Sequence, residues 1–274
     1  MAVTMADIAH LRKMSGAGMM DCKKALEEAD SDFEKAMEII RKKGQAVAAK
    51  RSDRDASEGC VLAADKEDFA AVVALKCETD FVAKNADFVA LTQDILDVAI
   101  SKRPATLADL LATPLANGRS VENLITERIG VTGEKMELGF YEYVTGAATV
   151  SYIHLGSKLA TIAAFNQPLE RQVARDVAMQ IAAMNPVSVT PDEVPQNVVN
   201  TELEIARDKA RQAGKPENLS DRIAEGALQK FYKDSTLLQQ GFIKDQSITV
   251  QQYLQQQDKA LTVTTFKRVS LNVE

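Results

Sequence analysis

The pattern that most constrains the fold of this chain occurs twice: two apolar, β-prone runs joined by a tight turn and followed by an amphipathic helix. The first copy has runs at residues 59–64 and 69–76 and a helix at 86–100; the second has runs at 149–154 and 158–165 and a helix at 169–184. Apolar runs joined by a short turn are typical of β-hairpins. Further strands are predicted at 135–144 and 262–273. The sequence therefore predicts an α+β fold with two related subdomains, each built on an antiparallel three-stranded sheet.

Residues 4–44 show the helical spacing of apolar side chains instead. Three short helices are predicted, with Thr4 and Asp7 forming an N-terminal cap and Gly44 closing the third helix in a left-handed conformation. The positions expected to form the core of this bundle are Ile8, Leu11, Met19, Cys22, Ala25, Leu26, Ala29, Phe33, Ala36, Met37 and Ile40. About forty residues is close to the lower limit for independent folding, and a unit of this size is more often a docking module than a catalyst.

A polar segment at residues 191–240 is inserted into the second copy of the repeat. Apolar residues recur at helical spacing on both sides of a break at Gly214-Lys215-Pro216; they are Leu203, Ala206, Ala210 and Ala213 before it and Leu219, Ile223, Ala227 and Phe231 after it. A short turn between two helices favours antiparallel packing. The thin, alanine-rich seam predicts a helical hairpin that protrudes from the core as a contact surface.

These patterns divide the chain into four parts. Residues 1–52 are predicted to form the three-helix docking module, which resembles ubiquitin-associated domains, and residues 53–57 an exposed linker. Residues 58–146 form the first core subdomain, and residues 147–274 form the second, with the hairpin inserted at 191–240. The basic residues Lys50, Arg51 and Arg54 near the linker are interleaved with acids, which weakens their interpretation as a nucleic-acid patch.

Charge and composition argue against several classes of function. The chain has a formal net charge of -6 and a pI near 5.2, which argues against broad binding to a phosphate backbone. No apolar run approaches the roughly 20 residues that span a membrane, and the N-terminus lacks the pattern of a secretory signal. Cys22, Cys60 and Cys77 are odd in number and lack metal-ligand spacing, so buried thiols and a reducing cytoplasm are expected.

Motifs that carry covalent chemistry are scarce. Gly214-Lys215 runs into a proline and cannot form a phosphate loop, and Gly16-Ala17-Gly18 lacks the preceding strand and the third glycine of a dinucleotide site. His10, expected on a helix surface, and His154 are the two histidines, so neither a metal cluster nor a nucleophile–histidine pair is predicted. No catalytic residue, metal or cofactor is therefore expected.

The methionine pair Met19-Met20 opens a predicted helix directly after a double-glycine turn. Methionine offers an adaptable apolar surface, because its side chain repacks easily. Met19 shares a helix face with Cys22 and is expected in the core. Met20 is rotated off that face, which favours contact with a partner.

A second unusual stretch, Thr79-Asp80-Phe81-Val82, follows the second strand of the first hairpin. Thr79 or Asp80 can cap a turn at this point. Phe81 is then either a lid on the local core or a residue that contacts a partner. A similar choice applies to His154, which is either a solvated turn residue or a partner contact. The residues alone leave both choices open.

Both stretches belong to longer segments that resemble a known family. The segments SGAGMMDCKKALEEA at residues 15–29 and CETDFVAKN at residues 77–85 are similar to the two signature segments of bacterial elongation factor Ts, although Ser15 stands where threonine is commoner. Members of that family are guanine nucleotide exchange factors of the translational GTPase elongation factor Tu. The order of helical module, two related subdomains and inserted hairpin matches the family along the whole chain.

The resemblance implies a set of contacts with that GTPase. By position, Arg12, Met19 and Met20 would dock on its nucleotide-binding domain, Asp80 and Phe81 with their neighbours Thr79 and Val82 would reach the region behind its magnesium site, and His154, Ile129 and Gly130 would line the same contact. The aromatic ring would wedge between helices of the GTPase and disturb its metal and phosphate ligands. The segment around His154 departs from the commoner family form. The hairpin touches the GTPase in some members.

Three hypotheses follow. The first is a guanine nucleotide exchange factor acting on elongation factor Tu in the cytoplasm, which binds the GDP-bound and nucleotide-free forms in a one-to-one or dimeric complex, without cofactor, direct nucleic acid or membrane. The second is an interaction adaptor that recruits an acidic or apolar partner through its three-helix module. The third is a small-molecule enzyme at the junction of the two sheets, which requires a deep cleft with paired titratable groups.

Overall fold

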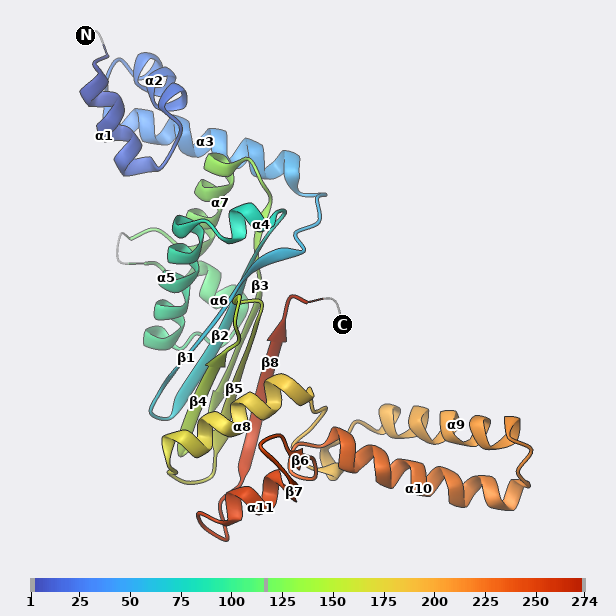
Figure 1. Ribbon diagram of the computed structural model, residues 1–274. Coiled ribbons are helices and arrows are strands. Elements are labelled where there is room, and N and C mark those ends of the chain that lie inside the picture. Colours follow the sequence, from blue (N-terminus) through green and yellow to red (C-terminus); the bar gives the residue numbers. More distant parts are fainter. Residues whose placement is uncertain (1–2, 116–117, 273–274) are drawn as a thin grey trace.

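In a computed structural model, which describes residues 3–115 and 118–272, two antiparallel three-stranded sheets lie at the centre of the chain (Figure 1). The first has the order β1-β2-β3 (Glu58–Lys66, Phe69–Cys77 and Met136–Thr145), and the second has the order β4-β5-β8 (Ala148–Ile153, Leu159–Phe165 and Val263–Ser270). These sheets confirm the α+β fold. β8 ends at Ser270, before the predicted end at residue 273, which lies outside the described residues.

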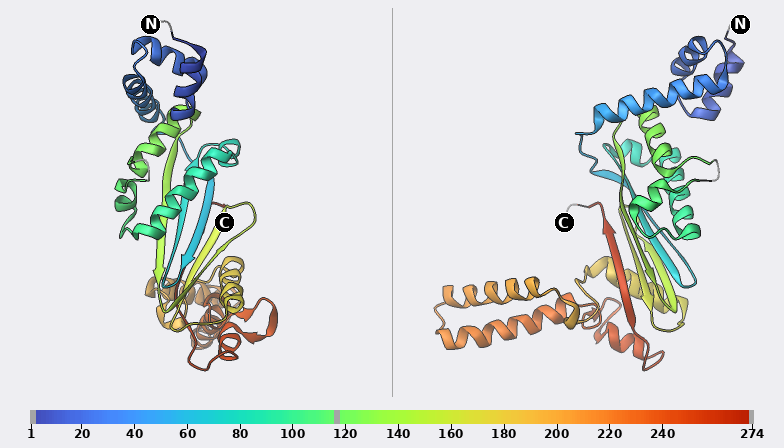
Figure 2. Two further views of the ribbon diagram at one scale, coloured as in Figure 1. Left: turned by 90° about the vertical axis from the view of Figure 1, so that its left-hand side faces the viewer. Right: turned by 180° about the vertical axis from the view of Figure 1, so that it is seen from behind.

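The two sheets pack face to face. The side chains buried between them are small, mostly alanine and valine: Val61, Ala63, Ala70, Val72, Ala74, Val144, Ala160, Ile162, Ala164 and Val269. The outer face of the first sheet is covered by α5 (Ala86–Lys102), α6 (Leu107–Ala112) and α7 (Val121–Thr132), and that of the second by α8 (Arg171–Met184) (Figure 2). β2 and β5 are buried on both faces, which explains why their sequences are continuous apolar runs.

The N-terminal module consists of α1 (Met5–Ser15), α2 (Met19–Glu28) and α3 (Phe33–Arg51), and it stands at one end of the molecule (Figure 1). Its start is the predicted one. The hydroxyl of Thr4 accepts a hydrogen bond from the N–H of Asp7 at 3.2 Å, and the carboxylate of Asp7 accepts one from the N–H of Thr4 at 3.0 Å. This capping box satisfies two backbone donors that the first turn of α1 would otherwise leave open.

The prediction that Gly44 closes the third helix is wrong. α3 continues to Arg51, and Gly44 lies buried in its interior, where α3 packs against α7. A Cβ atom added to Gly130 of α7 would lie only 2.6 Å from the Cα atom of Gly44. The two glycines thus let α3 and α7 approach closely, and the space is tightest at Gly130, so Gly44 serves helix packing and not a left-handed turn.

The inserted segment forms the predicted antiparallel hairpin. After a short 3-10 turn, η1 (Pro191–Glu193), α9 (Gln196–Gln212) and α10 (Glu217–Ser235) lie side by side and project away from the core (Figures 1 and 2). The alanines at positions 206 and 210 of α9 are buried in the seam, as expected.

The predicted return face of this hairpin is wrong. Ser220 and Ala224 of α10 are buried, whereas Leu219 and Ile223 are 44% and 38% exposed and Ala227 is exposed. The true seam lies one residue away, a rotation of about 100° around the helix. The turn between the helices sets which side of α10 faces α9, and that phase is a property of the turn geometry that apolar spacing does not report.

A buried carboxylate ties α8 to the segment that follows the hairpin. Beside the small sheet of β6 (Gly241–Phe242) and β7 (Asp245–Thr249) and the helix α11 (Val250–Gln255), Asp176 of α8 accepts hydrogen bonds from Lys244 Nζ at 2.7 Å, Gln172 Nε2 at 2.7 Å and the Tyr253 hydroxyl at 2.9 Å. Burial opposes ionisation of Asp176, but the three donors outweigh it and lower the pKa of this carboxyl. Burial, aided by the bond to Asp176, raises the pKa of Tyr253 to about 12.

Replacing Asp176 by asparagine is expected to lower the free energy of unfolding by about 1–3 kcal/mol, because Lys244 loses its counter-ion and one donor loses its acceptor. A carboxyl whose folded pKa is lowered stabilises the fold above its unfolded pKa of about 3.9, and that contribution is lost as the pH falls through the folded value. Urea unfolding between about pH 5 and pH 1 should therefore show a steeper loss of stability for the wild type than for Asp176→Asn. Parallel pH profiles would contradict this role of Asp176.

Candidate partner-binding site

β2 leads into α4 (Asp80–Ala83), a single helical turn at the end of the first sheet. Thr79 is its N-cap, with the hydroxyl accepting a hydrogen bond from the N–H of Val82 at 3.4 Å. Ala83 is buried and Val82 packs on the core, whereas Phe81 leaves 83% of its surface exposed. The turn is anchored on one side and presents an aromatic ring to solvent on the other. Of the two alternatives for Phe81, the lid is therefore excluded.

Asp80 places a negative charge beside this ring. Its carboxylate accepts a hydrogen bond from Lys84 Nζ at 2.6 Å, and this bond is the main cause that lowers the pKa of Asp80, with a smaller attraction from Lys158. The Asp80 side chain is 44% exposed. An exposed aromatic ring and an ionised carboxylate thus share one short turn.

The residues just before α4 include a buried thiol. Burial raises the pKa of Cys77 to about 12, aided by the nearby charge of Glu134, and burial raises the pKa of Cys60 to about 11. Cys77 Sγ donates a hydrogen bond to the carbonyl oxygen of Thr79 at 3.2 Å. Cys22 is buried as well. The cysteines are therefore structural, as the sequence predicted, and Cys60 and Cys77 are protonated at neutral pH.

A tight turn between β4 and β5 is tied to the first sheet. The carbonyl oxygen of Ser157 accepts a hydrogen bond from the N–H of Val61 at 2.7 Å, and Lys158 pairs with Glu58 at 2.7 Å. Lys158 is also the residue whose charge attracts Asp80. The turn is thereby held on the side of the molecule that carries α4.

This turn exposes His154 and Leu155. The Nδ1 atom of His154 lies 3.1 Å from the hydroxyl of Tyr152, and Leu155 is 93% exposed. His154 thus has a partner within the chain and is still open to solvent. The structure is compatible with both alternatives, a solvated turn residue and a residue that contacts a partner. Sequence reasoning missed Leu155, because a single leucine in a turn has no periodicity and only its position at the tip of a hairpin marks it.

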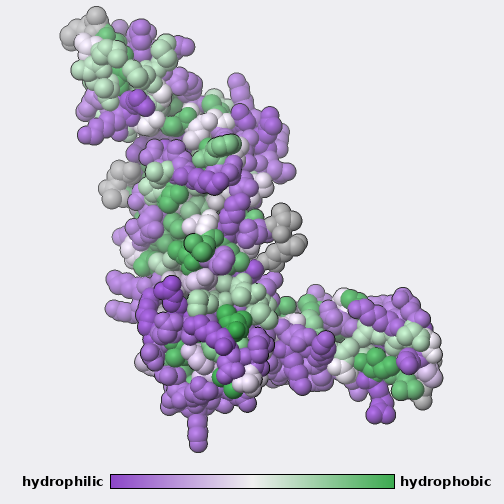
Figure 3. Space-filling model, in the orientation of Figure 1, coloured by the Kyte–Doolittle hydropathy of each residue, from purple (hydrophilic) through white to green (hydrophobic). Residues whose placement is uncertain are grey.

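The methionines of the N-terminal module are at its surface. Met19 and Met20 are 44% and 64% exposed, so the prediction that Met19 lies in the core is wrong. Met19, the first residue of α2, instead lines a groove of about 470 Å³ together with Met5 and Arg12 of α1. Apolar residues gather on this module in Figure 3, and a further apolar patch lies near the far end of the hairpin, where Ile205 and other exposed residues line a groove.

The remaining two candidate positions lie on α7, where Ile129 is buried and Gly130 is half-buried. Ile129 is buried in the core of the first subdomain. Gly130 packs against Gly44 at the crossing of α3 and α7. Neither presents a side chain next to Phe81, so the structure does not bring these two residues together with the exposed ones.

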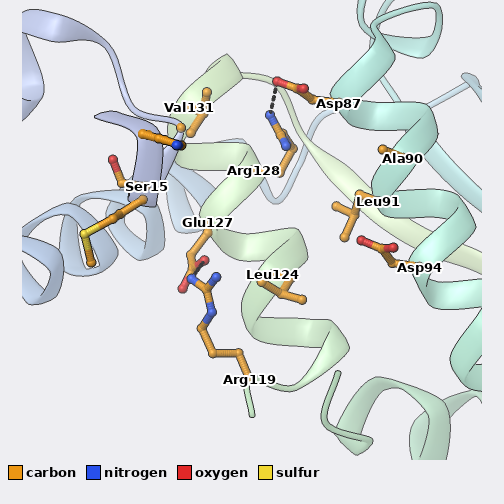
Figure 4. A pocket seen from close by; sticks show the side chains of 13 residues that line it. Ser15, Asp87, Ala90, Leu91, Asp94, Arg119, Leu124, Glu127, Arg128 and Val131 are labelled. Carbon is orange, nitrogen blue, oxygen red and sulfur yellow. Dashed lines mark hydrogen bonds and ion pairs between the residues drawn. The ribbon is translucent and has the colours of Figure 1, made fainter. Parts of the chain in front are cut away.

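A hollow of about 320 Å³ lies between the N-terminal module and the core helices α5 and α7 (Figure 4). Arg128 donates a hydrogen bond to Asp87 across it at 3.2 Å, and Arg119 pairs with Glu127. Both ion pairs lie within the core, and Glu127 also pairs with Arg41 of α3 at 3.6 Å, which links the module to α7. Within residues 3–115 and 118–272, no group of three histidine, cysteine or acidic side chains is placed to hold a metal ion, and no helix of this part of the chain is long and apolar enough to cross a membrane.

The most exposed apolar side chains, among them Phe81 and Leu155, thus lie on outlying parts of the α+β fold: a helical module, a single helical turn, a hairpin turn and a projecting helical pair. A partner that covers these side chains lowers the free energy of the complex, because burial removes their apolar surface from water.

Comparison with known proteins identifies the family. The family model described as Elongation factor TS matches residues 78–272. Elongation factor Ts of Porphyromonas gingivalis is 69% identical over 274 residues, and that of Azobacteroides pseudotrichonymphae is 54% identical over 275, each across the whole of both chains. That of Phocaeicola vulgatus is 46% identical over 331 aligned positions, again covering both chains. The chain therefore belongs to the elongation factor Ts family, and it is a bacterial translation elongation factor.

Proposed function

We propose that this chain is a guanine nucleotide exchange factor of elongation factor Tu and that it promotes GDP release by contact alone. Membership of the family supplies the partner. The observation that supports the proposal most directly is Phe81, 83% exposed on an anchored turn beside the ionised Asp80. No bond is made or broken in this function, so it needs neither covalent chemistry nor a cofactor. The proposed location is the cytoplasm.

The energetic requirement is an unfavourable coupling between factor and nucleotide on one GTPase, and such coupling is reciprocal. Each tenfold loss of nucleotide affinity corresponds to about 1.4 kcal/mol. The factor supplies this free energy only if its contacts are better in the nucleotide-free conformation of the partner. Burial of one phenylalanine ring is worth roughly 1.5–3 kcal/mol, so Phe81 alone is of the size needed for one to two orders of magnitude.

The proposed contacts divide between the parts of the chain. The module of residues 1–52 docks on the nucleotide-binding domain of the GTPase through Arg12, Met19 and Met20. The turn of Thr79, Asp80, Phe81 and Val82 acts behind the magnesium site of the GTPase. His154, from the subdomain of residues 147–274, lies beside that second contact. Ile129 and Gly130 support these contacts from the helix crossing. Because the module and the turn belong to one chain, binding of the module to the GTPase raises the effective concentration of the turn at its own contact site. The hairpin adds a further contact, in a complex that is one-to-one or dimeric.

A release assay tests this function. Elongation factor Tu of the same organism, loaded with a fluorescent GDP analogue and mixed with excess GDP, should release the analogue faster when the chain is added in substoichiometric amount. Turnover is the expected sign, because an exchange factor leaves each GTPase once new nucleotide has bound. A chain that binds the GTPase and leaves the release rate unchanged would be an adaptor, and that result would overturn the proposal.

A further inference from the structure

We infer that Glu134 is a positioning residue that holds Phe81 in the orientation a partner buries. The inference rests on the proposed function for one of its readouts, but the contacts that carry it lie within this chain. Glu134 belongs to the connection between α7 and β3, and 55 positions separate it from Thr79 in the sequence.

Thr79 directs both of its donors to this one carboxylate. Its backbone N–H donates to Glu134 Oε2 at 3.1 Å, and its hydroxyl donates to Glu134 Oε1 at 2.7 Å. Because the hydroxyl proton points at Glu134, the lone pairs of that oxygen face the N–H of Val82, which donates to it at 3.4 Å. Glu134 therefore sets the direction of the group that caps α4, and hydrogen bonds linked in this way strengthen one another.

The residue before Thr79 is held from the same side. Glu78 accepts two hydrogen bonds from Arg51 Nη1, each at 3.2 Å, and one from the backbone N–H of Lys135 at 2.7 Å. Arg51 is the last residue of α3, the helix that carries the docking module. The start of α4 is thereby tied to the α7–β3 connection and to the module helix at once.

This external support matters because α4 cannot orient itself. A helix of four residues is far below the length that is stable alone. Phe81 is almost wholly exposed, so packing of the ring does not orient it either. Without the clamp of Glu134, the cap of α4 would lose its fixed hydroxyl, and the ring would have to be ordered at the moment of binding, which costs affinity.

The exchange assay with Glu134→Gln tests the clamp. Glutamine has nearly the same size, but it presents one acceptor and one donor to the two donors of Thr79. The acceleration of GDP release should fall by about three- to tenfold. Glu137→Gln is the matched control, because Glu137 follows closely in β3 and its carboxylate pairs with Lys76 and Lys135 and not with Thr79. The control should keep wild-type activity, and a loss as large as that of Glu134→Gln would overturn the inference.

The same substitution in a Phe81→Ala background separates this inference from the proposed function. If Glu134 acts through the ring, Glu134→Gln should have no further effect once the ring is absent. A full additional loss in that background would show that Glu134 acts elsewhere and would overturn the inference. If Phe81→Ala alone leaves exchange unchanged, the proposed wedge fails, and the test of the clamp then rests on a readout without the GTPase.

That readout is the mobility of the turn. The chain contains no tryptophan, so Phe81→Trp places a single tryptophan on α4, which can be excited selectively over the five tyrosines. Its time-resolved anisotropy should show faster local motion when Glu134→Gln is added and no change when Glu137→Gln is added. Equal local motion with and without Glu134 would refute the positioning role, whatever happens to exchange.

Discussion

Phe81→Ala is expected to lower the acceleration of GDP release by about 10- to 100-fold while leaving the chain as stable as the wild type. The ring is 83% exposed in the free chain, so its removal deprives the fold of little buried surface. In the complex the same ring is proposed to be buried, which is worth roughly 1.5–3 kcal/mol. At about 1.4 kcal/mol for each factor of ten, that free energy gives the expected range.

The concentration dependence of the release rate checks this prediction. Because the wedge is proposed to favour the nucleotide-free conformation, its loss should reduce the limiting rate at saturating factor more than it raises the half-saturation concentration. Phe140→Ala is the control, since Phe140 is a second surface phenylalanine, 41% exposed on β3. It should leave exchange unchanged. A Phe81→Ala chain with the wild-type limiting rate would refute the wedge.

Gly130→Ala is expected to lower the free energy of unfolding by about 1–3 kcal/mol, because the added methyl group has no space. Its Cβ atom would lie 2.6 Å from the Cα atom of Gly44, a contact between two backbones that no side-chain rotation relieves. α3 and α7 must then move apart. Since α3 carries the docking module and α7 packs on the core, the substitution should also slow exchange by misplacing Met19 and Met20 relative to Phe81.

Two further glycines calibrate this result in urea unfolding. Gly44→Ala should cost less than Gly130→Ala, because its Cβ atom meets nothing closer than the carbonyl oxygen of Thr126, at 3.2 Å. Gly226 lies within α10, and a Cβ added there would point into open space. Gly226→Ala should therefore stabilise the chain by about 0.5–1 kcal/mol, the usual gain for alanine over glycine in a helix. A Gly130→Ala chain of unchanged stability would show that the helices separate without cost.

Much of the fold could be predicted from local patterns. The second hairpin was expected at residues 149–154 and 158–165, and β4 and β5 occupy Ala148–Ile153 and Leu159–Phe165. The strands could be predicted from the sequence, because a short apolar run bounded by turn residues is typical of a buried strand. The same holds for the capping box at Thr4, whose two hydrogen bonds join residues three positions apart.

The predictions that failed depend on contacts distant in the sequence. Gly44 looked like a helix end because glycine often closes helices, but its neighbour across the interface is Gly130, far along the chain. Met19 has the spacing of a core residue, yet it is 44% exposed and lines a surface groove. The predicted buried face of α10 differs from the observed one by one residue, because the turn between α9 and α10 decides which side of α10 packs against α9.

The sequence by itself determined the elements of this protein, its two related sheets, its projecting hairpin and the family to which it belongs, because apolar periodicity and two signature segments are local properties. Only the tertiary structure decided that Phe81 faces solvent, since the burial of a residue depends on what packs around it. Residues 82 and 83, and not Phe81, pack against the core. Only the tertiary structure brought Glu134 to Thr79 across 55 positions. A hydrogen bond between distant residues leaves no pattern in one sequence, because nothing in the identity of either residue specifies the other.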